Sequence, residues 1–286
     1  MPQGELELLR QLRGFAAPAG GDLIIAAGED DAACWVEVGG GFTVASCDTF
    51  VEGVHFDLGR QKPEAIGWRS LAFSLGDLAA KGAAPTYALA SISIPRRWPD
   101  QVVLGIYAGM SELAARVGLR LVGGDTTAAP HDGSLSLSLL GRTALRPLAR
   151  AAAQPGWLIG VSGPLGGARV SWERPLPQLA RGAALCQAGA CCGDISDGLL
   201  RELDKFAAAA GVGARLDLGS VPLAPGVAAL DAISSGEEVE LVCVGPKAAI
   251  SGLHLVGELT ADGRVVVVGP GGIEVQVAKR GYDHFA

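Results

Sequence analysis

Apolar residues recur at helical spacing in two long stretches of the chain. Between Pro63 and Lys81 they follow one another at intervals of three and four residues, and Gly82 ends the pattern. The spacing predicts a helix over this stretch. It predicts a second helix over Asp100–Val117, with Asp100 as its cap after Pro99. Shorter helices are predicted over residues 5–15, from about Leu176, and over Leu199–Ala210.

Strand-like stretches separate these helices. Leu135–Arg142 alternates leucine with serine, which predicts a strand with one apolar face and one small, polar face. Strands and helices alternate irregularly, which favours an α+β fold over a regular parallel βαβ array. The other predicted strands lie near residues 23–26, 34–37, 42–46, 87–94, 119–122, 157–162, 215–218, 240–244, 256 and 265–268, with one more running into Gly193.

Length and composition indicate two globular units. The chain has 286 residues, 49% of them apolar, which is enough for a sizeable core. Pro147–Pro155 separates two series of strands and helices. We therefore expect an N-terminal domain over residues 1–146 and a C-terminal domain over residues 147–286.

The charge of the chain excludes one class of partner. The net charge is −7, and no Lys/Arg run exists that could follow a nucleic-acid backbone. The start of the chain shows no signal-peptide pattern, and Val265–Val268 is too short to span a bilayer. We expect a soluble, cytoplasmic protein without a membrane partner. Its six cysteines, which lack paired CxxC spacing, are expected to be reduced and mostly buried.

Three glycine-flanked or strand-flanked acidic segments mark the first half. They are Glu29–Asp31, Ser46–Thr49 and Gly123–Thr127, and a further aspartate, Asp77, lies inside an apolar helix pattern next to Leu78. An aspartate in apolar surroundings is costly unless it is paired or binds a metal. Mg²⁺ prefers a few carboxylates together with water and phosphate oxygens. For any single aspartate, a turn or helix cap is the alternative explanation.

A fourth acidic segment, Gly193–Leu200, precedes a predicted helix in the second half. Asp194 and Asp197 are three residues apart and would share a face if the turn is helical. The amides of a helix N-terminus also favour an anion. The alternative is a capping arrangement in which Ser196 is the cap and Asp197 complements the helix dipole.

Patterns for other chemistries are weak. None of the four histidines lies in an HExxH motif, and the glycine-rich segment Gly163–Gly167 lacks the Lys and Ser/Thr of a P-loop. No GxGxxG follows a predicted strand. These observations favour chemistry supported by carboxylates and metal ions over nucleophilic catalysis.

Taken together, the acidic segments resemble the thiamine-monophosphate kinase family, in the superfamily of aminoimidazole ribonucleotide synthetase and selenophosphate synthetase. The matching segments occur in the family's order and span nearly the whole chain. They are GEDDAA (28–33), SCDTFVEGVHF (46–56), LAFSLGDLAAKGAAP (71–85), VGGDTT (122–127), GDISDGL (193–199), SGEEVEL (235–241) and GYDHF (281–285).

The resemblance implies a two-domain fold of the aminoimidazole ribonucleotide synthetase type: a half-barrel N-terminal domain that dimerises through its sheet, and a C-terminal α+β domain. It implies in-line transfer of the γ-phosphoryl group of ATP to thiamine monophosphate with several Mg²⁺ ions, and no catalytic residue beyond those that position metal and ATP. By position, the metal ligands would be Asp30, Ser46, Cys47, Asp48, Asp77, Asp125, Asp194 and Asp197. ATP would contact Gly124, Asp125, Arg150 and Ser196, and the acceptor would contact His55, Glu237 and Tyr282.

Two alternatives stay open at this point. One is a related ATP-dependent synthetase of the same superfamily. The other is a weakened homologue that binds nucleotide or thiamine phosphates, because Gly236–Leu241 is GEEVEL where the family has GEDYEL.

Overall fold

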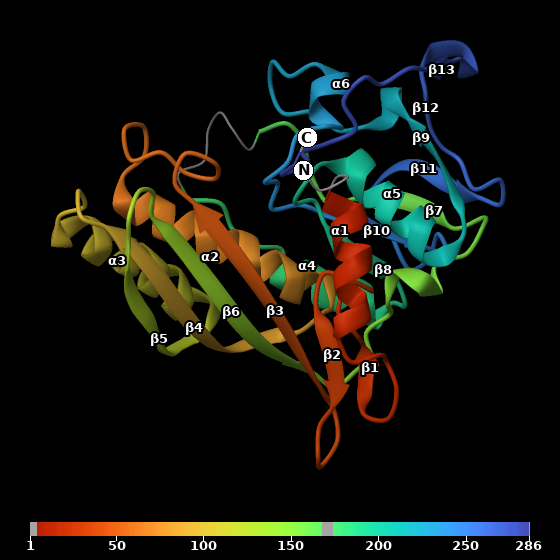
Figure 1. Cartoon of the computed structure of the whole chain (residues 1–286). Helices are drawn as coiled ribbons and strands as arrows, with labels where there is room; N and C mark the ends of the chain where they lie inside the picture. Colours follow the sequence, from red (N-terminus) through yellow and green to blue (C-terminus); the bar gives the residue numbers. More distant parts are fainter. Residues whose placement is uncertain (1–4, 168–173, 286) are drawn as a thin grey trace.

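Two β-sheets, each built from its own stretch of the chain, form the framework of the protein (Figure 1). The computed structural model describes residues 5–167 and 174–285. The first sheet takes its strands from residues 23–143 and the second from residues 158–275. The predicted α+β fold is confirmed, and the division at residues 146 and 147 stays a prediction.

The two long helices have almost the bounds that the sequence predicts. Helix α2 covers Pro63–Ala80 and helix α3 covers Asp100–Val117. Asp100 does not cap α3, because Pro99 takes the cap position in an extended conformation and no side chain caps the helix. Asp100 lies in the first turn, where its charge complements the helix dipole. The shorter helices are α1 (Glu5–Leu12), α4 (Leu179–Gln187), α5 (Leu199–Ala210) and α6 (Ala229–Ala232).

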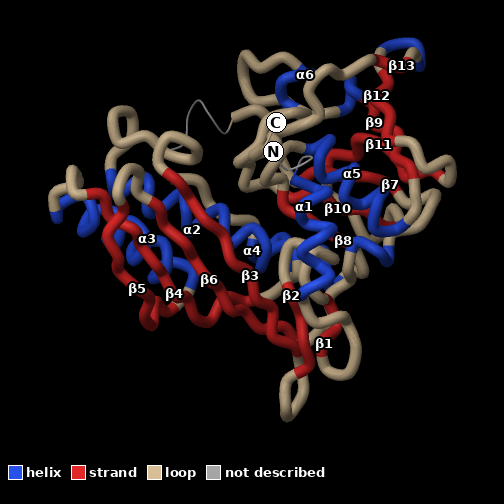
Figure 2. Tube along the Cα trace, in the orientation of Figure 1, coloured by secondary structure: helices blue, strands red, loops and turns tan. Residues whose placement is uncertain are grey.

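The first sheet has six strands in the order β1-β2-β3-β6-β4-β5. Helices α2 and α3 pack on one of its faces (Figure 2). Leu135, Leu137 and Leu139 are buried on that face, whereas Ser138 and Leu140 are exposed on the other. The predicted alternation is thus confirmed. The strands are β1 (Leu23–Ile25), β2 (Ala33–Val36), β3 (Phe42–Val51), β4 (Ala84–Pro95), β5 (Arg120–Ala129) and β6 (Ser134–Thr143).

The second sheet has seven strands in the order β13-β12-β9-β11-β7-β10-β8, and both of its faces are covered. Val242 and Val244 face a core shared with α5, while Leu241 and Cys243 face a core shared with α4 and the end of α2. The strands are β7 (Leu158–Val161), β8 (Cys191–Asp194), β9 (Gly213–Asp217), β10 (Leu241–Gly245), β11 (His254–Thr260), β12 (Val265–Val268) and β13 (Glu274–Val275).

Helix α2 belongs to both cores. Leu71, Leu75 and Leu78 are fully buried in the first core, and Ala79 and Ala80 pack in the cluster that lines the second sheet. A helix that is apolar on nearly all sides is a buried helix. Asp77, two residues before Ala79, consequently lies where the two sheets meet.

One pair of cysteines forms a disulfide, although all six were expected to be reduced. Cys192 on β8 lies directly opposite Cys243 on β10, and the two form a disulfide. The prediction of six reduced thiols is wrong for this pair, because only the register of the two strands brings residues 51 positions apart together. Cys34, Cys47, Cys186 and Cys191 are free thiols.

The helices of the described residues include none that is long and apolar enough to cross a membrane.

Candidate functional site

A cavity of about 2170 Å³ receives residues from both halves of the chain. Strand β3, helix α2 and the turn before β2 line it from the N-terminal half. The end of β8, helix α5 and the C-terminal segment around Tyr282 line it from the other half. Both halves of the chain therefore contribute to the wall of this cavity.

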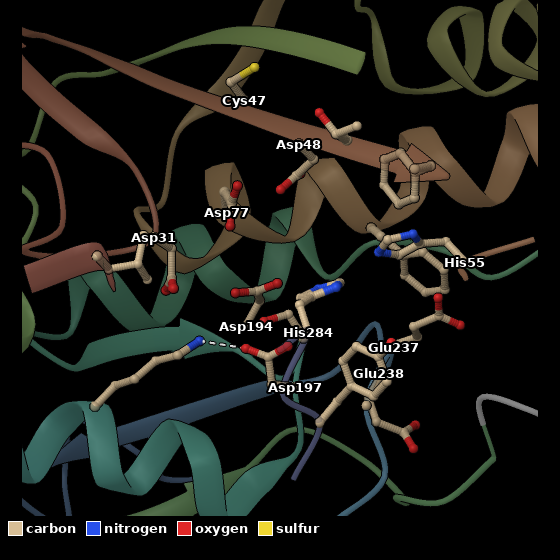
Figure 3. Close-up of a pocket in the computed structure, with 18 of the residues that line it drawn as sticks. Asp31, Cys47, Asp48, His55, Asp77, Asp194, Asp197, Glu237, Glu238 and His284 are labelled. Carbon is tan, nitrogen blue, oxygen red and sulfur yellow. Dashed lines mark hydrogen bonds and ion pairs between the residues drawn. The ribbon is translucent and has the colours of Figure 1, made fainter. Parts of the chain in front are cut away.

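Three aspartates meet in this cavity. Asp31, Asp77 and Asp194 each offer a carboxylate oxygen, and these oxygens lie within 4.8 Å of one another. Figure 3 shows Asp77 and Asp194 facing each other across the gap between α2 and β8. Gly76 permits this approach, because a Cβ atom at that position would lie 3.0 Å from Asp194 Oδ2. A fourth carboxylate, Asp48, extends from β3 toward the same gap.

The charges on one side of this group are not neutralised by the protein. Burial, together with the neighbouring carboxylates, raises the pKa of Asp77 and of Asp194 well above the usual range. Burial also raises the pKa of Asp48, and the charges of Asp31 and Asp197 add to the effect. We call Asp48, Asp77 and Asp194 the unpaired side of the site.

Two buried oxygens of the group have no hydrogen-bond partner within the described part of the chain: Oδ2 of Asp31 and Oδ1 of Asp194. Unpartnered buried carboxylate oxygens are costly, and a divalent cation with a preference for oxygen ligands would satisfy them. The donor set of carboxylates without thiolate or imidazole suits Mg²⁺. The residues present therefore fit the metal that the sequence predicts.

On the opposite side the carboxylates are paired with buried cations. Lys81 Nζ lies 2.5 Å from Asp30 Oδ1 and donates a hydrogen bond of 2.9 Å to the Cys192 carbonyl. Arg150 forms ion pairs with Asp30 and with Asp31. Although burial acts to raise it, the positive charges of Arg150 and Lys81 hold the pKa of Asp31 below its usual value.

The pairing continues onto helix α5. Arg150 Nη2 lies 2.7 Å from Glu202 Oε2. Lys205 Nζ lies 2.6 Å from Glu202 Oε1 and 3.0 Å from Asp197 Oδ2, the contact drawn as a dashed line in Figure 3. We call Asp30, Lys81, Arg150, Glu202, Lys205 and Asp197 the paired side of the site. Asp31 lies between the two sides.

The structure divides the predicted metal ligands. It brings Asp48, Asp77 and Asp194 together on the unpaired side, and it places Asp30 and Asp197 in ion pairs on the paired side. Asp31 takes a position in the cluster that sequence reasoning did not assign to it. The adjacent pair Asp30–Asp31 was the available signal, since neighbouring carboxylates in a turn face different partners.

The side chains of Ser46 and Cys47, two predicted metal ligands on β3, point in opposite directions. The Ser46 hydroxyl is buried and, with strand periodicity, shares a face with Asp48. The Cys47 sulfur points away from the carboxylates in Figure 3 and lies 3.4 Å from the Ser138 hydroxyl. Only the backbone of Cys47 remains to face a ligand in the cavity.

Gly124 and Asp125, two of the predicted ATP contacts, lie away from the cavity. Both belong to β5, one of the two edge strands of the first sheet, and both are exposed. Among the described residues that line the cavity, neither is present, whereas Arg150 and Ser196 are. The chain by itself therefore does not bring all four predicted ATP contacts together.

The segment between Asp194 and Asp197 is not helical. Asp194 ends β8, and α5 begins at Leu199 after Gly198, which has a φ of 116°. Asp194 and Asp197 hence do not share a helix face. The capping alternative is also wrong, because Gly198 takes the cap position and no side chain caps the helix.

The three predicted acceptor contacts all line the cavity: His55, Glu237 and Tyr282. His55 Nδ1 accepts a hydrogen bond of 3.0 Å from the Val51 amide, and burial, aided by the nearby His284, lowers the pKa of His55. The His55 and His284 rings lie 5.2 Å apart. The amide of Tyr282 donates to the Asp197 carbonyl at 2.9 Å, so the tail is anchored while its side chain faces the cavity.

The chain is similar in sequence to a known protein family and to enzymes of known activity. Residues 29–143 match the family described as AIR synthase related protein, N-terminal domain. The thiamine-monophosphate kinase of Rhodopirellula baltica is 33% identical, over 72% of this chain and 69% of that protein. The thiamine-monophosphate kinase of Mycobacterium tuberculosis is 31% identical, over 93% of this chain and 88% of that protein.

The fold also matches a solved structure, AaThiL complexed with AMPPCP and TMP. The TM-score is 0.85 and the identity 24%, over 99% of this chain and 97% of that one. The sequence relatives carry the family assignment and the structural match carries the fold. The chain therefore belongs to the thiamine-monophosphate kinase family.

Proposed function

We propose that this chain transfers the γ-phosphoryl group of ATP to thiamine monophosphate, forming thiamine diphosphate and ADP. The observation that carries the proposal is the cluster of Asp31, Asp77 and Asp194, two of which belong to the unpaired side, inside a cavity shared by both halves. A transfer between two phosphorylated substrates must overcome strong repulsion, and buried carboxylates that lack a protein cation are suited to recruit metal ions for it. The named relatives support the same reaction.

Asp31, Asp48, Asp77 and Asp194 would hold Mg²⁺, with the Ser46 and Cys47 backbone beside them. Bound there, Mg²⁺ supplies positive charge that offsets the negative charge of the phosphates during transfer. We assign no nucleophile or general base to the protein, because an acceptor phosphate is already anionic at neutral pH. The residues of the chain position the two substrates for in-line attack.

Arg150 and Ser196 contribute to the ATP side of the cavity. Arg150 is fixed by its ion pairs with Asp31 and Glu202, so its orientation is set before a ligand arrives. The Ser196 hydroxyl lies 3.5 Å from Glu202 Oε1, in the turn that leads into α5. Such preorganised groups lose little conformational freedom when ATP binds.

His55, Glu237 and Tyr282 form the acceptor side. Tyr282 offers an aromatic face to the cationic thiazolium ring, and Glu237 offers a negative charge. The edge of the Tyr282 ring packs against His284, with 4.8 Å between ring centroids. These side chains come from the turn after β3, from the segment before β10 and from the C-terminal segment, so the acceptor would join both halves.

We also propose a homodimer formed through the open face of the first sheet. Leu89 and Leu140 are exposed there, and β5 is a ten-residue edge strand with mostly exposed residues. Long exposed edges and apolar faces are usually covered. Gly124 and Asp125 on β5 would then serve the cavity of the partner subunit, which agrees with their absence from the lining of their own.

The proposed dimer is tested by light scattering and by mixing inactive variants. Asp77→Asn and Asp125→Asn chains that are inactive alone should recover roughly a quarter of the activity when they exchange subunits, because one cavity in a mixed dimer is intact. Scattering that gives a monomer at micromolar concentration would contradict the dimer.

The activity itself is tested by ADP release with ATP, Mg²⁺ and thiamine monophosphate, and by identification of thiamine diphosphate. Thiamine and aminoimidazole ribonucleotide precursors serve as control acceptors. ADP release that depends on thiamine monophosphate supports the kinase. Turnover with another acceptor alone would favour the related synthetase, and binding of thiamine monophosphate without turnover would favour the weakened homologue.

A further inference from the structure

An ion pair joins the two halves at the acceptor end of the cavity. Arg69 Nη2, on helix α2, lies 3.1 Å from Glu237 Oε2, in the turn before β10. The side chains are 14% and 30% exposed, and both line the cavity. A partly desolvated pair of this kind is stronger than a surface pair, yet both partners can be reached by a ligand.

The backbone holds Glu237 in an unusual conformation. Its φ is 59°, which makes it the one non-glycine residue with positive φ in the described parts of the chain. The Glu237 amide donates to the Ser196 carbonyl at 2.6 Å, and a Cβ atom at Gly236 would lie 2.6 Å from the same oxygen. Residues held in left-handed conformations by their surroundings cluster at ligand sites. The Glu237 side chain is thus aimed by its fixed backbone.

Arg69 lies on the same face of helix α2 as Asp77, one of the carboxylates of the unpaired side. Phe73 follows it by four residues and Asp77 by eight, so the three form one row along α2, and all three line the cavity. The Arg69 guanidinium lies 5.3 Å from the Phe73 ring centroid. The helical rise separates Arg69 from Asp77 by about 12 Å between Cα atoms, a span that two long side chains and one phosphate can bridge.

We propose that Arg69 binds the phosphate of the acceptor, and that the Arg69–Glu237 pair is exchanged when the acceptor binds. This inference rests on the proposed function. Thiamine monophosphate carries a fixed cation and a phosphate anion, so it is the charge complement of this pair. Its thiazolium takes the place of Arg69 beside Glu237, and its phosphate takes the place of Glu237 beside Arg69.

The exchange explains how the site selects a phosphorylated acceptor. An acceptor with both charges replaces one ion pair with two, and arginine matches phosphate geometry through paired N–H donors. Thiamine, which lacks the phosphate, would have to separate Glu237 from Arg69 and offers no anion to take the place of the carboxylate beside the guanidinium. The ion pair therefore acts against the unphosphorylated compound as well as in favour of the phosphorylated one.

The test is calorimetric titration of thiamine monophosphate and of thiamine, without ATP or metal, into the wild-type chain and Arg69→Met. We expect Arg69→Met to bind thiamine monophosphate at least tenfold more weakly. The same variant should bind thiamine as well as the wild type or several-fold more tightly, because the thiazolium no longer has to displace Arg69 from Glu237. Arg69→Lys should retain part of the affinity for the phosphorylated ligand.

Two further variants complete the experiment. Glu237→Gln should lose most of its thiamine affinity, which provides an independent check if Arg69→Met does not fold. Arg264→Met, which removes the ion pair between the residue before β12 and Glu274 on β13, should change neither affinity, because neither residue lines the cavity. Equal weakening of both ligands by Arg69→Met, or no change in either, would overturn the exchange. A wild-type chain that binds neither ligand would overturn the proposed function as well.

Discussion

Both the paired and the unpaired side of the site contain several buried carboxylates, but only on the paired side do cations of the protein neutralise them. On the paired side, Lys81, Arg150 and Lys205 lie within ion-pair distance of Asp30, Glu202 and Asp197. On the unpaired side, burial and the charges of neighbouring carboxylates raise the pKa values of Asp77 and Asp194 well above the usual range. The difference lies in whether the protein supplies the cation.

We infer from this difference that the paired side stabilises the fold, whereas the unpaired side serves the function of the cavity. The paired side is complete without a ligand and connects the turn before β2, helix α2, the segment at Arg150 and helix α5. On the unpaired side, buried carboxylates repel one another, an unfavourable interaction that the proposed metal binding would relieve. Changes on the two sides should therefore have opposite effects on the stability of the metal-free protein.

The largest expected effect is on the paired side. Lys81→Met leaves the buried Asp30 carboxylate with less positive charge, and breaking a buried ion pair costs about 3–5 kcal/mol. At about 2–4 °C per kcal/mol for large domains, thermal unfolding should occur roughly 10 °C lower.

The matched control is the double variant Lys81→Met, Asp30→Asn, in which no unpaired charge remains. It should recover much of the lost stability. A double variant as unstable as Lys81→Met alone would show that Lys81 acts through packing and not through charge.

The second expected effect is on the unpaired side. Asp194→Asn removes a carboxylate from the cluster, and we expect kcat/KM to fall at least about 100-fold, or about 2.7 kcal/mol. The unfolding temperature without metal should stay the same or rise, in contrast to Lys81→Met. Full activity in this variant would remove Asp194 from the metal site.

The third prediction concerns Tyr282, which belongs to neither the paired nor the unpaired side and therefore serves as a control for both. Tyr282→Ala removes an aromatic face from the acceptor end, and a lost cation–π contact of about 1–2 kcal/mol raises the KM for thiamine monophosphate roughly five- to thirty-fold. The KM for ATP should barely change. An equal rise in both constants would leave Tyr282 as a residue that only anchors the tail.

The smallest expected effect concerns pH and metal-free stability. The folded-state pKa of Asp77 is raised, so the folded chain retains a proton that the unfolded chain loses above its ordinary pKa of about 4. Stability from this residue is therefore lost as pH rises from about 4 through the folded-state pKa, at about 1.4 kcal/mol for each pKa unit.

Asp77→Asn cannot ionise, so in EDTA it should unfold a few degrees above the wild type at pH 8, and the gap should close toward pH 5. Saturating Mg²⁺ should reverse the order at pH 8. A gap that stays constant with pH would mean that the Asp77 charge is not the source of the destabilisation.

Sequence reasoning predicted the parts of the fold that follow local patterns. Helices α2 and α3 show a clear helical period, and their bounds agree within one residue. Strands β3 and β5 are longer than predicted, because their polar continuations, Cys47–Val51 and Gly123–Ala129, look like loops until neighbouring strands pair with them. The cross-strand disulfide was missed for the same reason.

The candidate site was predictable where a residue type is unusual in its local context. Asp77 was found because a carboxylate in an apolar helix is costly, and the structure places it in the cluster. Lys81, Glu202 and Lys205 carry no such signal, since a charged residue at a helix end or on an amphipathic helix is ordinary. Lys81, Glu202 and Arg69 have partners in distant segments, and only tertiary packing reveals these pairings.

Binding of a divalent cation by the unpaired carboxylates can be measured by titrating Mn²⁺ into the metal-free chain and recording electron paramagnetic resonance spectra, because Mn²⁺ accepts the same oxygen ligands as Mg²⁺. We expect at least one bound Mn²⁺ per wild-type chain and loss of that ion in Asp77→Asn, with the ion retained in the Tyr282→Ala control. Equal Mn²⁺ binding by the wild type and Asp77→Asn, or none by the wild type, would contradict this expectation.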